Sequence, residues 1–484
     1  MNPFQAWHLP PGFPLSVGEI KAWEGGGVPA LRYPSLSMPR LRELMEFLRD
    51  EREKTVVSFP VKRVVHAVDR VARRFLDRQD PLRDAALEAL GPFSGFSSPM
   101  AEAVLDGMAR SWTGDGLWEL VRSEFSDPAV LDGFSQNLVG DRTRALGFPL
   151  TFHLGAGTVP GVATTSLIRS LLVKSASLLK PGLGDIPLPV VFSKALQEED
   201  SDLARSLAVV YWPGEMIDRT EAILKGVDLV VAYGSDETVG WIRKHLPPRI
   251  PLRAYRHRMG FGLLGQEAFG REASPDGEGV WAVAQAAARA VSLFDQKGCV
   301  SPHVFLVEKG GEVAPREFAV LLARAFQELE PVLPSGRVSL EDGVALQQLR
   351  GVAELEEGSG RGVVHHGGEE SPWTVLYLPG GPVEPSCLNR TVRVVPVDTI
   401  PDALAELKDW VPYLQTVGVA GLGEQEAEVT EVLARLGVSR ITELGGVPWP
   451  RPGWHHDGSG PLLDLVRWTD VEGADPVSSG IAEE

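Results

Sequence analysis

A ten-residue stretch, Phe294-Asp-Gln-Lys-Gly-Cys-Val-Ser-Pro-His303, contains one of only two cysteines in the chain. Residues 280–293 are rich in strong helix formers and predict a helix, and residues 304–308 predict a buried strand. Cys299 therefore falls in a tight helix-to-strand connection, where Gly298 lets the backbone bend or a ligand approach closely. Loops held between rigid elements carry reactive side chains, whereas a lone cysteine is also commonly a small buried hydrophobe.

Two strand ends could contact a phosphate or a dinucleotide. Residues 228–240 predict a strand that ends at Gly234, followed by Ser235 as a cap and by a helix whose N–H groups would meet an anion. Lys180 and Pro181 follow another predicted strand, and open α/β sheets bind ligands beyond the carboxyl ends of their strands. An ordinary tight turn and a solvated lysine are the alternatives, because neither stretch is a GxGxxG motif.

A third connection, residues 153–161, reads His-Leu-Gly-Ala-Gly-Thr-Val-Pro-Gly and suits either the close approach of a ligand or a plain turn.

The paired histidines do not suggest a metal site. His365 and His366 lie in a charged stretch, and residues 455–457 read His-His-Asp in a proline-rich one. Neither group has the helical i, i+4 spacing or the third ligand of a typical zinc site, so no metal is predicted.

Composition narrows the class of protein. A chain of 484 residues predicts two or three domains, and its net charge of −18 argues against a broad nucleic-acid footprint and against docking on anionic lipid. Two cysteines without a CxxC motif fit a reducing compartment. Without a signal-like N-terminus or a run of 18 apolar residues, the sequence predicts a cytoplasmic protein that has no membrane span.

Residues 1–38 predict an extended arm without regular structure, and residues 39–132 predict helices that are broken at Gly91-Pro92 and at residues 97–99. Between residues 146 and 270, segments with the hydrophobic pattern of a strand alternate with segments that have the pattern of a helix, which indicates βαβ units and a mostly parallel sheet. Strands are expected at 148–154, 177–179, 207–212, 227–233 and 251–255, with helices at 166–172, 190–197, 217–225 and 238–245.

A second α/β block is expected over residues 278–397, with an exposed charged loop at 354–371. Two further helix-strand pairs follow, with helices at 401–410 and 425–436. The predicted fold class is thus α/β. The expected parts of the chain are an arm and helical region at 1–144, two α/β parts at 145–270 and 271–400, a C-terminal part at 401–472 and a disordered tail at 473–484.

Four motifs in this order carry a family resemblance: His153-Leu-Gly-Ala-Gly-Thr-Val-Pro-Gly, Ser166-Leu-Ile-Arg-Ser-Leu-Leu-Val-Lys-Ser-Ala, Asp295-Gln-Lys-Gly-Cys-Val-Ser-Pro-His, and Trp454-His-His-Asp-Gly with Asp464-Leu-Val-Arg-Trp-Thr-Asp. Over residues 145–472 the chain resembles the aldehyde dehydrogenase superfamily and, more closely, the LuxC-type acyl-CoA reductases. These are the reductase components of the long-chain fatty acid reductase complex of luminous bacteria. The resemblance implies reduction of a fatty acyl-CoA, or of an acyl-protein thioester, to an aldehyde. It also implies an aldehyde-dehydrogenase-like fold, with a Rossmann-like cofactor domain at 145–270, a catalytic domain with Cys299 at 271–400, and a C-terminal part at 401–472 that completes the fold and makes oligomer contacts.

The resemblance also implies roles. The Cys299 thiolate would attack the thioester, and Thr158 stands where superfamily members place an oxyanion-binding Asn. The water-activating Glu of aldehyde-oxidising members is missing, and His257 falls near its place as a proton donor or substrate contact. Losing that base favours reduction, since general-base help is worth roughly 10²–10⁴-fold. Cofactor contacts are expected from Lys180, Pro181, Gly214, Gly234, Ser235 and Gly240.

NADPH is the expected cofactor, because Leu183 replaces the acidic residue that would repel a 2′-phosphate in NAD-preferring relatives. The region around Cys387 lacks the superfamily's ribose-holding motif, so no role transfers there. The resemblance further implies a homo-oligomer and an acyl-protein synthetase or acyltransferase as partner. Two other functions remain open: a CoA-acylating, NAD-dependent aldehyde dehydrogenase for short aldehydes, and an acyl-transfer scaffold that does not reduce.

Overall fold

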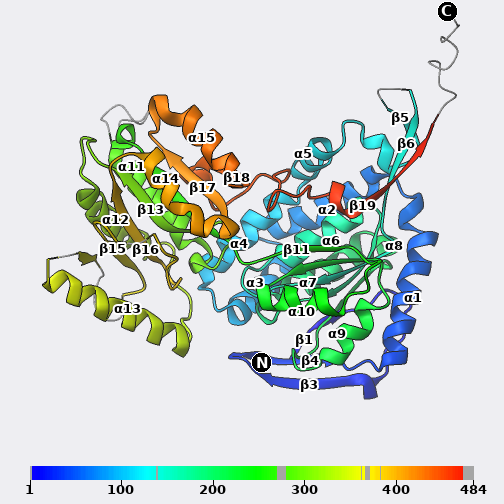
Figure 1. Ribbon diagram of the computed structural model, residues 1–484. Coiled ribbons are helices and arrows are strands. Elements are labelled where there is room, and N and C mark those ends of the chain that lie inside the picture. The colour runs from blue at the N-terminus through cyan, green and yellow to red at the C-terminus, as the bar shows by residue number, and fades with distance from the viewer. Residues whose placement is uncertain are drawn as a thin grey trace, which may run out of the picture.

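Two mainly parallel sheets organise the chain, each in its own lobe (Figure 1). The structure is a computed structural model that describes residues 3–137, 140–269, 279–360, 362–365, 371–381 and 383–472. The first sheet has the order β11-β10-β7-β8-β9-β2, and the second has the order β14-β15-β16-β13-β12-β17-β18. The predicted α/β class is confirmed.

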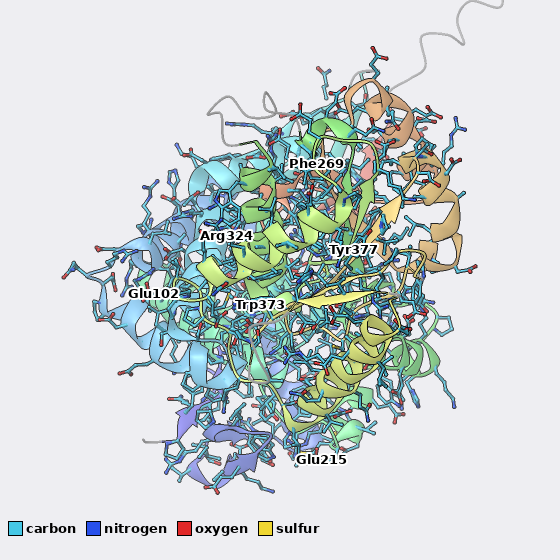
Figure 2. The ribbon with its side chains drawn as sticks, turned by 90° about the vertical axis from the view of Figure 1, so that its left-hand side faces the viewer. Glu102, Glu215, Phe269, Arg324, Trp373 and Tyr377 are labelled. Carbon is cyan, nitrogen blue, oxygen red and sulfur yellow. The ribbon has the colours of Figure 1, made fainter. Side chains whose placement is uncertain are left out.

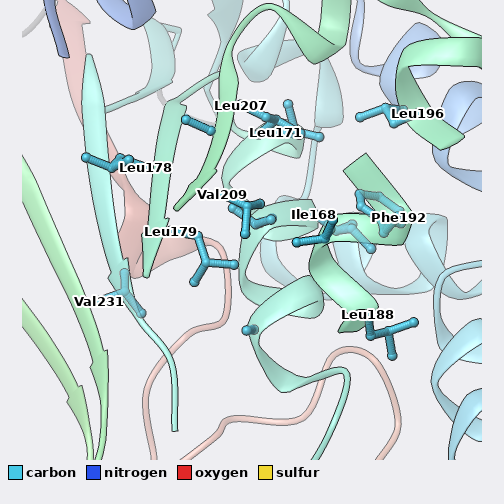
Figure 3. Packing of buried hydrophobic residues seen from close by; sticks show 14 of the residues in the cluster. Ile168, Leu171, Leu178, Leu179, Leu188, Phe192, Leu196, Leu207, Val209 and Val231 are labelled. Atoms are coloured by element: carbon cyan, nitrogen blue, oxygen red, sulfur yellow. The ribbon is translucent and has the colours of Figure 1, made fainter. Parts of the chain in front are cut away.

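The six-stranded sheet is parallel except for β2 (Trp7–His8), which runs antiparallel to β9. Its other strands are β7 (Leu150–Leu154), β8 (Ala176–Lys180), β9 (Leu207–Val210), β10 (Leu229–Tyr233) and β11 (Leu252–Tyr255). The connecting helices are α6 (Val162–Leu172), α7 (Pro187–Glu199), α8 (Ser201–Ala204), α9 (Ile217–Leu224) and α10 (Asp236–His245). Figure 3 shows Leu179 and Val209 of the sheet beside Ile168 of α6 and Phe192 of α7, all buried, so apolar side chains pack between the sheet and these helices.

In the seven-stranded sheet, only β14 (Val363–His365) is antiparallel to its neighbour. The other strands are β12 (Met259–Leu264), β13 (Pro302–Glu308), β15 (Thr374–Tyr377), β16 (Thr391–Val397), β17 (Leu414–Ala420) and β18 (Arg440–Glu443). The helices are α11 (Gly279–Ser292), α12 (Pro315–Leu329), α13 (Leu340–Gly358), α14 (Ile400–Glu406) and α15 (Glu426–Arg435). Figure 2 views α12, which carries Arg324, in front of this sheet, and Trp373 beneath it stacks on Phe326 at 5.8 Å.

The region 39–132 is helical, as predicted, and contains α1 (Met38–Lys54), α2 (Val61–Leu76), α3 (Pro81–Ser94), α4 (Ser98–Ser111) and α5 (Gly114–Glu124). The predicted break at Gly91-Pro92 is wrong, because α3 continues through Pro92. The helix ends instead at Gly95, whose φ of +79° supplies the left-handed cap. A proline in the last turn disturbs little helix beyond it, so it can be accommodated there.

The predicted unstructured arm is also wrong. β3 (Ile20–Gly25) and β4 (Val28–Pro34) form a hairpin, and β1 (Phe4–Gln5) pairs with β4. The turn uses Gly26 and Gly27, whose φ angles of +59° and +67° suit a two-residue hairpin loop.

The charged loop expected at 354–371 is wrong where the structure describes it. α13 runs through Gly358, and β14 follows. A narrow buried stripe, with Leu346 and Ala353 in it, holds the helix while its glutamates face solvent. Residues 361 and 366–370 lie outside the described part.

A third sheet, β5 (Ser135–Gln136), β6 (Arg142–Gly147) and β19 (Val466–Val471), projects from the first lobe (Figure 1). Between β18 and β19 the chain passes from the second lobe to the first, and this crossing segment spans residues 444–465. In the described part of the chain, no helix is both long enough and apolar enough to cross a membrane.

The lobes meet through opposite sheet edges. β11 ends at Tyr255, at the carboxyl edge of the first sheet, and only residues 256–258 separate it from Met259, at the amino edge of the second. Loops that follow β7, β8 and β10 therefore face loops that precede β12, β13, β16 and β17. Side chains at this junction come from both lobes.

Candidate functional site

Cys299 lies in a strongly bent loop at the amino edge of the second sheet. After α11 ends at Ser292, three successive non-glycine residues, Phe294, Asp295 and Gln296, have left-handed φ angles of 60°, 48° and 63°. Such residues cost of order 1–3 kcal/mol each and persist only where their surroundings fix them. The expected bend beside Gly298 therefore lies upstream of it, and Gly298 instead packs tightly between Phe294 and Ser301.

Two buried side chains fix this loop to the segment before β16. Gln296 Nε2 donates to the carbonyl oxygens of Pro302 (2.8 Å) and Thr391 (2.7 Å), and the Thr391 N–H donates to Gln296 Oε1 (2.9 Å). Arg390 donates to Asp295 Oδ1 through Nε (3.0 Å) and Nη2 (2.8 Å). We call these contacts the loop clamp. It holds Cys299 where the strained backbone alone would not.

The thiol of Cys299 opens into a cavity of about 180 Å³ that lies between the lobes. The lining is largely apolar and comes from α4, α5, α6, the Cys299 loop and the crossing segment; it includes Met108, Trp112, Leu117, Leu120, Val159, Val162, Ile168, Phe294, Val300, Trp449 and Trp454. The Trp449 indole lies against α4, where a side chain on Gly107 would meet it within 2.4 Å. The cavity can therefore hold an apolar group next to a nucleophile.

His456, on the crossing segment, contacts the thiol. Its Nε2 lies 3.9 Å from Cys299 Sγ, within hydrogen-bonding distance for sulfur. The ring stacks on Tyr255 at 4.4 Å and on Trp454 at 4.7 Å, and Tyr255 stacks on Tyr233 at 4.8 Å. Burial lowers the pKa of His456 to about 4, since it disfavours the charged ring.

A charged pair adjoins this contact. Asp457, in a left-handed turn with φ 53°, accepts a hydrogen bond from the side chain of Gln415 on β17, and Arg258 Nε lies 3.3 Å from its Oδ2. Burial and, next, the charge of Asp457 raise the pKa of Cys299 to about 12, opposed by a hydrogen bond from Gln415 and the charge of Arg258. At neutral pH, Cys299 is therefore a neutral thiol.

Arg169 of α6 also lines the cavity and is only 7% exposed. Its Nε has no hydrogen-bond partner in the described part of the chain. A buried guanidinium is costly without an anionic or strongly polar partner, so the side chain is suited to a ligand oxygen in the cavity.

A second cavity, of about 470 Å³, lies at the carboxyl edge of the first sheet. Three of the residues predicted to contact a cofactor, Lys180, Gly214 and Gly234, line this cavity. Tyr233 lines it as well, and it also lines the Cys299 cavity. Burial lowers the pKa of Lys180 to about 8, partly opposed by Glu215, and its Nζ lies 5.7 Å from the rings of Tyr211 and Trp212. A buried amine beside aromatic rings at this edge fits a dinucleotide.

The other predicted cofactor residues do not line this cavity. Pro181 is buried behind Lys180, and Gly240 lies inside α10. Ser235 accepts a hydrogen bond from the Thr238 N–H, which makes it the N-cap of α10. The cap orients the helix N-terminus toward the cavity that Gly234 lines.

Comparison with known proteins identifies the family. Residues 56–468 match the model of a family described as acyl-CoA reductase (LuxC). The chain belongs to this family. Among its relatives are the long-chain acyl-protein thioester reductases of Aliivibrio fischeri, 25% identical over 87% of this chain and 84% of the relative, and of Vibrio harveyi, 24% identical over 85% and 83%.

Solved structures show that this LuxC-family chain has the aldehyde-dehydrogenase-like fold. The aldehyde dehydrogenase PutA from Anabaena variabilis, named as putative, superposes with a TM-score of 0.70 at 15% identity, covering 94% of this chain and 99% of that one. The Thermus 1-pyrroline-5-carboxylate dehydrogenase with bound NAD superposes with a TM-score of 0.70 at 12% identity, covering 97% and 93%.

Two residues that the family resemblance predicted for the site lie away from the Cys299 cavity. Thr158 is exposed, and its neighbour Val159 lines the cavity instead. His257 is exposed. Burial and, next, the charge of His257 lower the pKa of His303 to about 4. The next residue, Arg258, reaches Asp457. Both roles stay predictions.

The site also contains groups to which no role was assigned from the sequence. His456 and Asp457 were quoted in the motif Trp454-His-His-Asp-Gly and weighed as metal ligands, and the described residues include no group of three or more His, Cys, Asp or Glu that could hold a metal ion. Arg169 lies in the motif that begins at Ser166 but was given no role, and Gln415 gave no signal. The Asp457-Gly458 pair, typical of a tight turn, was the available clue that the preceding histidine is held in a fixed place.

Proposed function

We propose that the protein reduces a long-chain fatty acyl thioester, presented as acyl-CoA or on an acyl-protein, to the aldehyde through a thioester on Cys299. The observation that carries this proposal is the position of the Cys299 thiol in an apolar cavity. Tyr233 separates this cavity from the one that Lys180 lines, because it belongs to the wall of both. The relatives' names, long-chain acyl-protein thioester reductase, support the substrate class.

In the acyl-transfer step, Cys299 Sγ bonds to the acyl carbon and the original carbon–sulfur bond breaks, which releases a thiol. The surrounding side chains exclude water from the product, and Arg169 offers its charge to the thioester oxygen as negative charge develops there. Lys180 and the N-terminus of α10 would hold a nicotinamide cofactor, which when bound supplies hydride to the acyl group.

NADPH is the proposed cofactor. Leu183, the position whose acidic counterpart would repel a 2′-phosphate, has a partly buried apolar side chain, and Lys180 is a nearby cation. Glu215 partly offsets that charge. Equilibrium binding of NADPH and of NADH to the protein tests the preference, and tighter binding of NADH would refute it.

The decisive experiment is intact-mass detection of an acyl adduct with tetradecanoyl-CoA, followed by addition of NADPH. We expect the adduct to form, to be absent in Cys299→Ala, and to disappear with release of tetradecanal. Cys387→Ser is the matched control, because Cys387 is the other cysteine and donates to Thr391 Oγ1 at 3.7 Å. An adduct that persists with the cofactor would favour the acyl-transfer scaffold, and preference for acetyl-CoA would favour the short-chain enzyme.

A further inference from the structure

The buried thiol of Cys299 needs a proton acceptor. A thiolate, not a thiol, attacks a carbonyl carbon, yet burial and the charge of Asp457 raise the pKa of Cys299 to about 12. α11 offers no help, because its C-terminal end precedes the loop and carries the negative end of the helix dipole. The proton must therefore pass to a neighbouring base as the new bond forms.

We propose that His456 is a catalytic residue for acyl transfer, with Nε2 accepting the Cys299 proton during attack and returning it to the departing thiolate. The Sγ–H bond breaks as Sγ bonds to the acyl carbon, and the leaving sulfur gains the proton as its bond to that carbon breaks. The ring ends as it began, and no electrons are transferred. The inference rests on the proposed function for its substrate, and its structural basis is the 3.9 Å contact.

The stack around His456 fixes the direction of Nε2. Tyr255 and Trp454 contact the ring with interplanar angles of 22° and 27°, so the imidazole cannot turn away from the thiol without breaking both contacts. The turn at Asp457 and Gly458, closed by a 3.0 Å hydrogen bond from the Ser459 N–H to the His456 carbonyl, fixes the backbone. Fixed orientation is what a general base needs.

Burial, more than the surrounding charges, disfavours the protonated state of His456. Groups that face His456 or the thiol from neighbouring elements are Cys299, Tyr233, Tyr255, Arg169, Arg258, Arg440 and Asp457. Asp457 favours an imidazolium, whereas Arg169 and Arg258 oppose it. With its pKa lowered to about 4, the ring is a free base at neutral pH and readily gives its proton to a leaving thiolate.

The chain supplies a matched control in the adjacent histidine. The side chain of His455 is 64% exposed and points toward Glu124, with Nε2 3.7 Å from Oε1. The test compares His456→Asn, which removes the base but keeps a polar side chain, with His455→Asn. The rate of Cys299 acylation by tetradecanoyl-CoA is followed by intact mass without cofactor, after circular dichroism has confirmed the fold of each variant.

We expect His456→Asn to slow acylation by roughly 10²–10⁴-fold, with partial rescue by added imidazole, while His455→Asn acylates at the wild-type rate. The same variants are alkylated with iodoacetamide from pH 6 to 9, and Cys299 should react at least about tenfold more slowly in His456→Asn at neutral pH. Wild-type alkylation and acylation rates in a folded His456→Asn would overturn the proposal. If no thioester acylates the wild type, the proposed function fails, and alkylation alone decides the role of His456.

Discussion

The ion pair of the loop clamp gives a quantitative test of how Cys299 is held. Asp295 and Arg390 are at most 6% exposed at their side chains, and their closest contact is 2.8 Å. Asp295→Asn keeps the shape of the side chain and removes its charge. Removing one partner of a buried pair costs about 3–5 kcal/mol. Glu330, 2.8 Å from Arg390 Nη1, still pairs with the guanidinium, which places the expected loss near the lower end, about 3 kcal/mol.

Urea unfolding measures the loss in unfolding free energy. We expect the variant to unfold about 3 kcal/mol more easily, and Cys299 to become more open to alkylation as its three left-handed residues relax. The control is Glu328→Gln, which breaks the exposed Arg324–Glu328 pair of α12 and should cost less than about 0.5 kcal/mol. A loss below about 1 kcal/mol in Asp295→Asn, with unchanged alkylation, would refute the idea that this pair holds the loop.

Three further changes test the two cavities and one core histidine. Lys180→Met should weaken cofactor binding at least about tenfold in a fluorescence titration, since it removes the buried amine; unchanged affinity would exclude that contact. Arg169→Met should slow Cys299 acylation by roughly 10²–10³-fold, measured by intact mass, if the guanidinium stabilises the oxyanion. Burial lowers the pKa of His153 to about 3, so only the unfolded chain takes up this proton as pH falls from 6.5 to 5, at a cost of about 2 kcal/mol. His153→Gln should remove that part of the acid destabilisation in urea unfolding, and an unchanged slope would contradict it.

Local signals predicted most of the fold. The alternation of apolar runs placed β7 to β11 and their helices within a few residues, because each element carries its own periodicity. The hairpin of β3 and β4 was missed because it depends on pairing with β1 and on two left-handed glycines. The C-terminal turns of α13 were taken for a loop because a helix with one narrow buried stripe looks uniformly charged in sequence.

The candidate site likewise contains residues that local sequence could identify and residues that it could not. Cys299, Lys180 and Gly234 were predictable because each adjoins a recognisable strand end. His456 lies 157 residues from Cys299, and no spacing rule connects them. Arg169 lies in a quoted family motif, but the motif does not show that its side chain lines the Cys299 cavity. Only the three-dimensional path of the crossing segment reveals that these residues share one cavity.

That path explains why the chemistry belongs to neither lobe alone. The proposed nucleophile, Cys299, comes from the amino edge of the second sheet. Arg169 and Tyr233 come from the first lobe, and His456 comes from the segment that crosses between the lobes. A cysteine loop on one rigid lobe can be acylated only if the other two parts meet it within a few ångströms. The loop clamp and the aromatic stack therefore act together: one fixes Sγ, the other fixes Nε2, and the contact between these atoms depends on how the two lobes are packed.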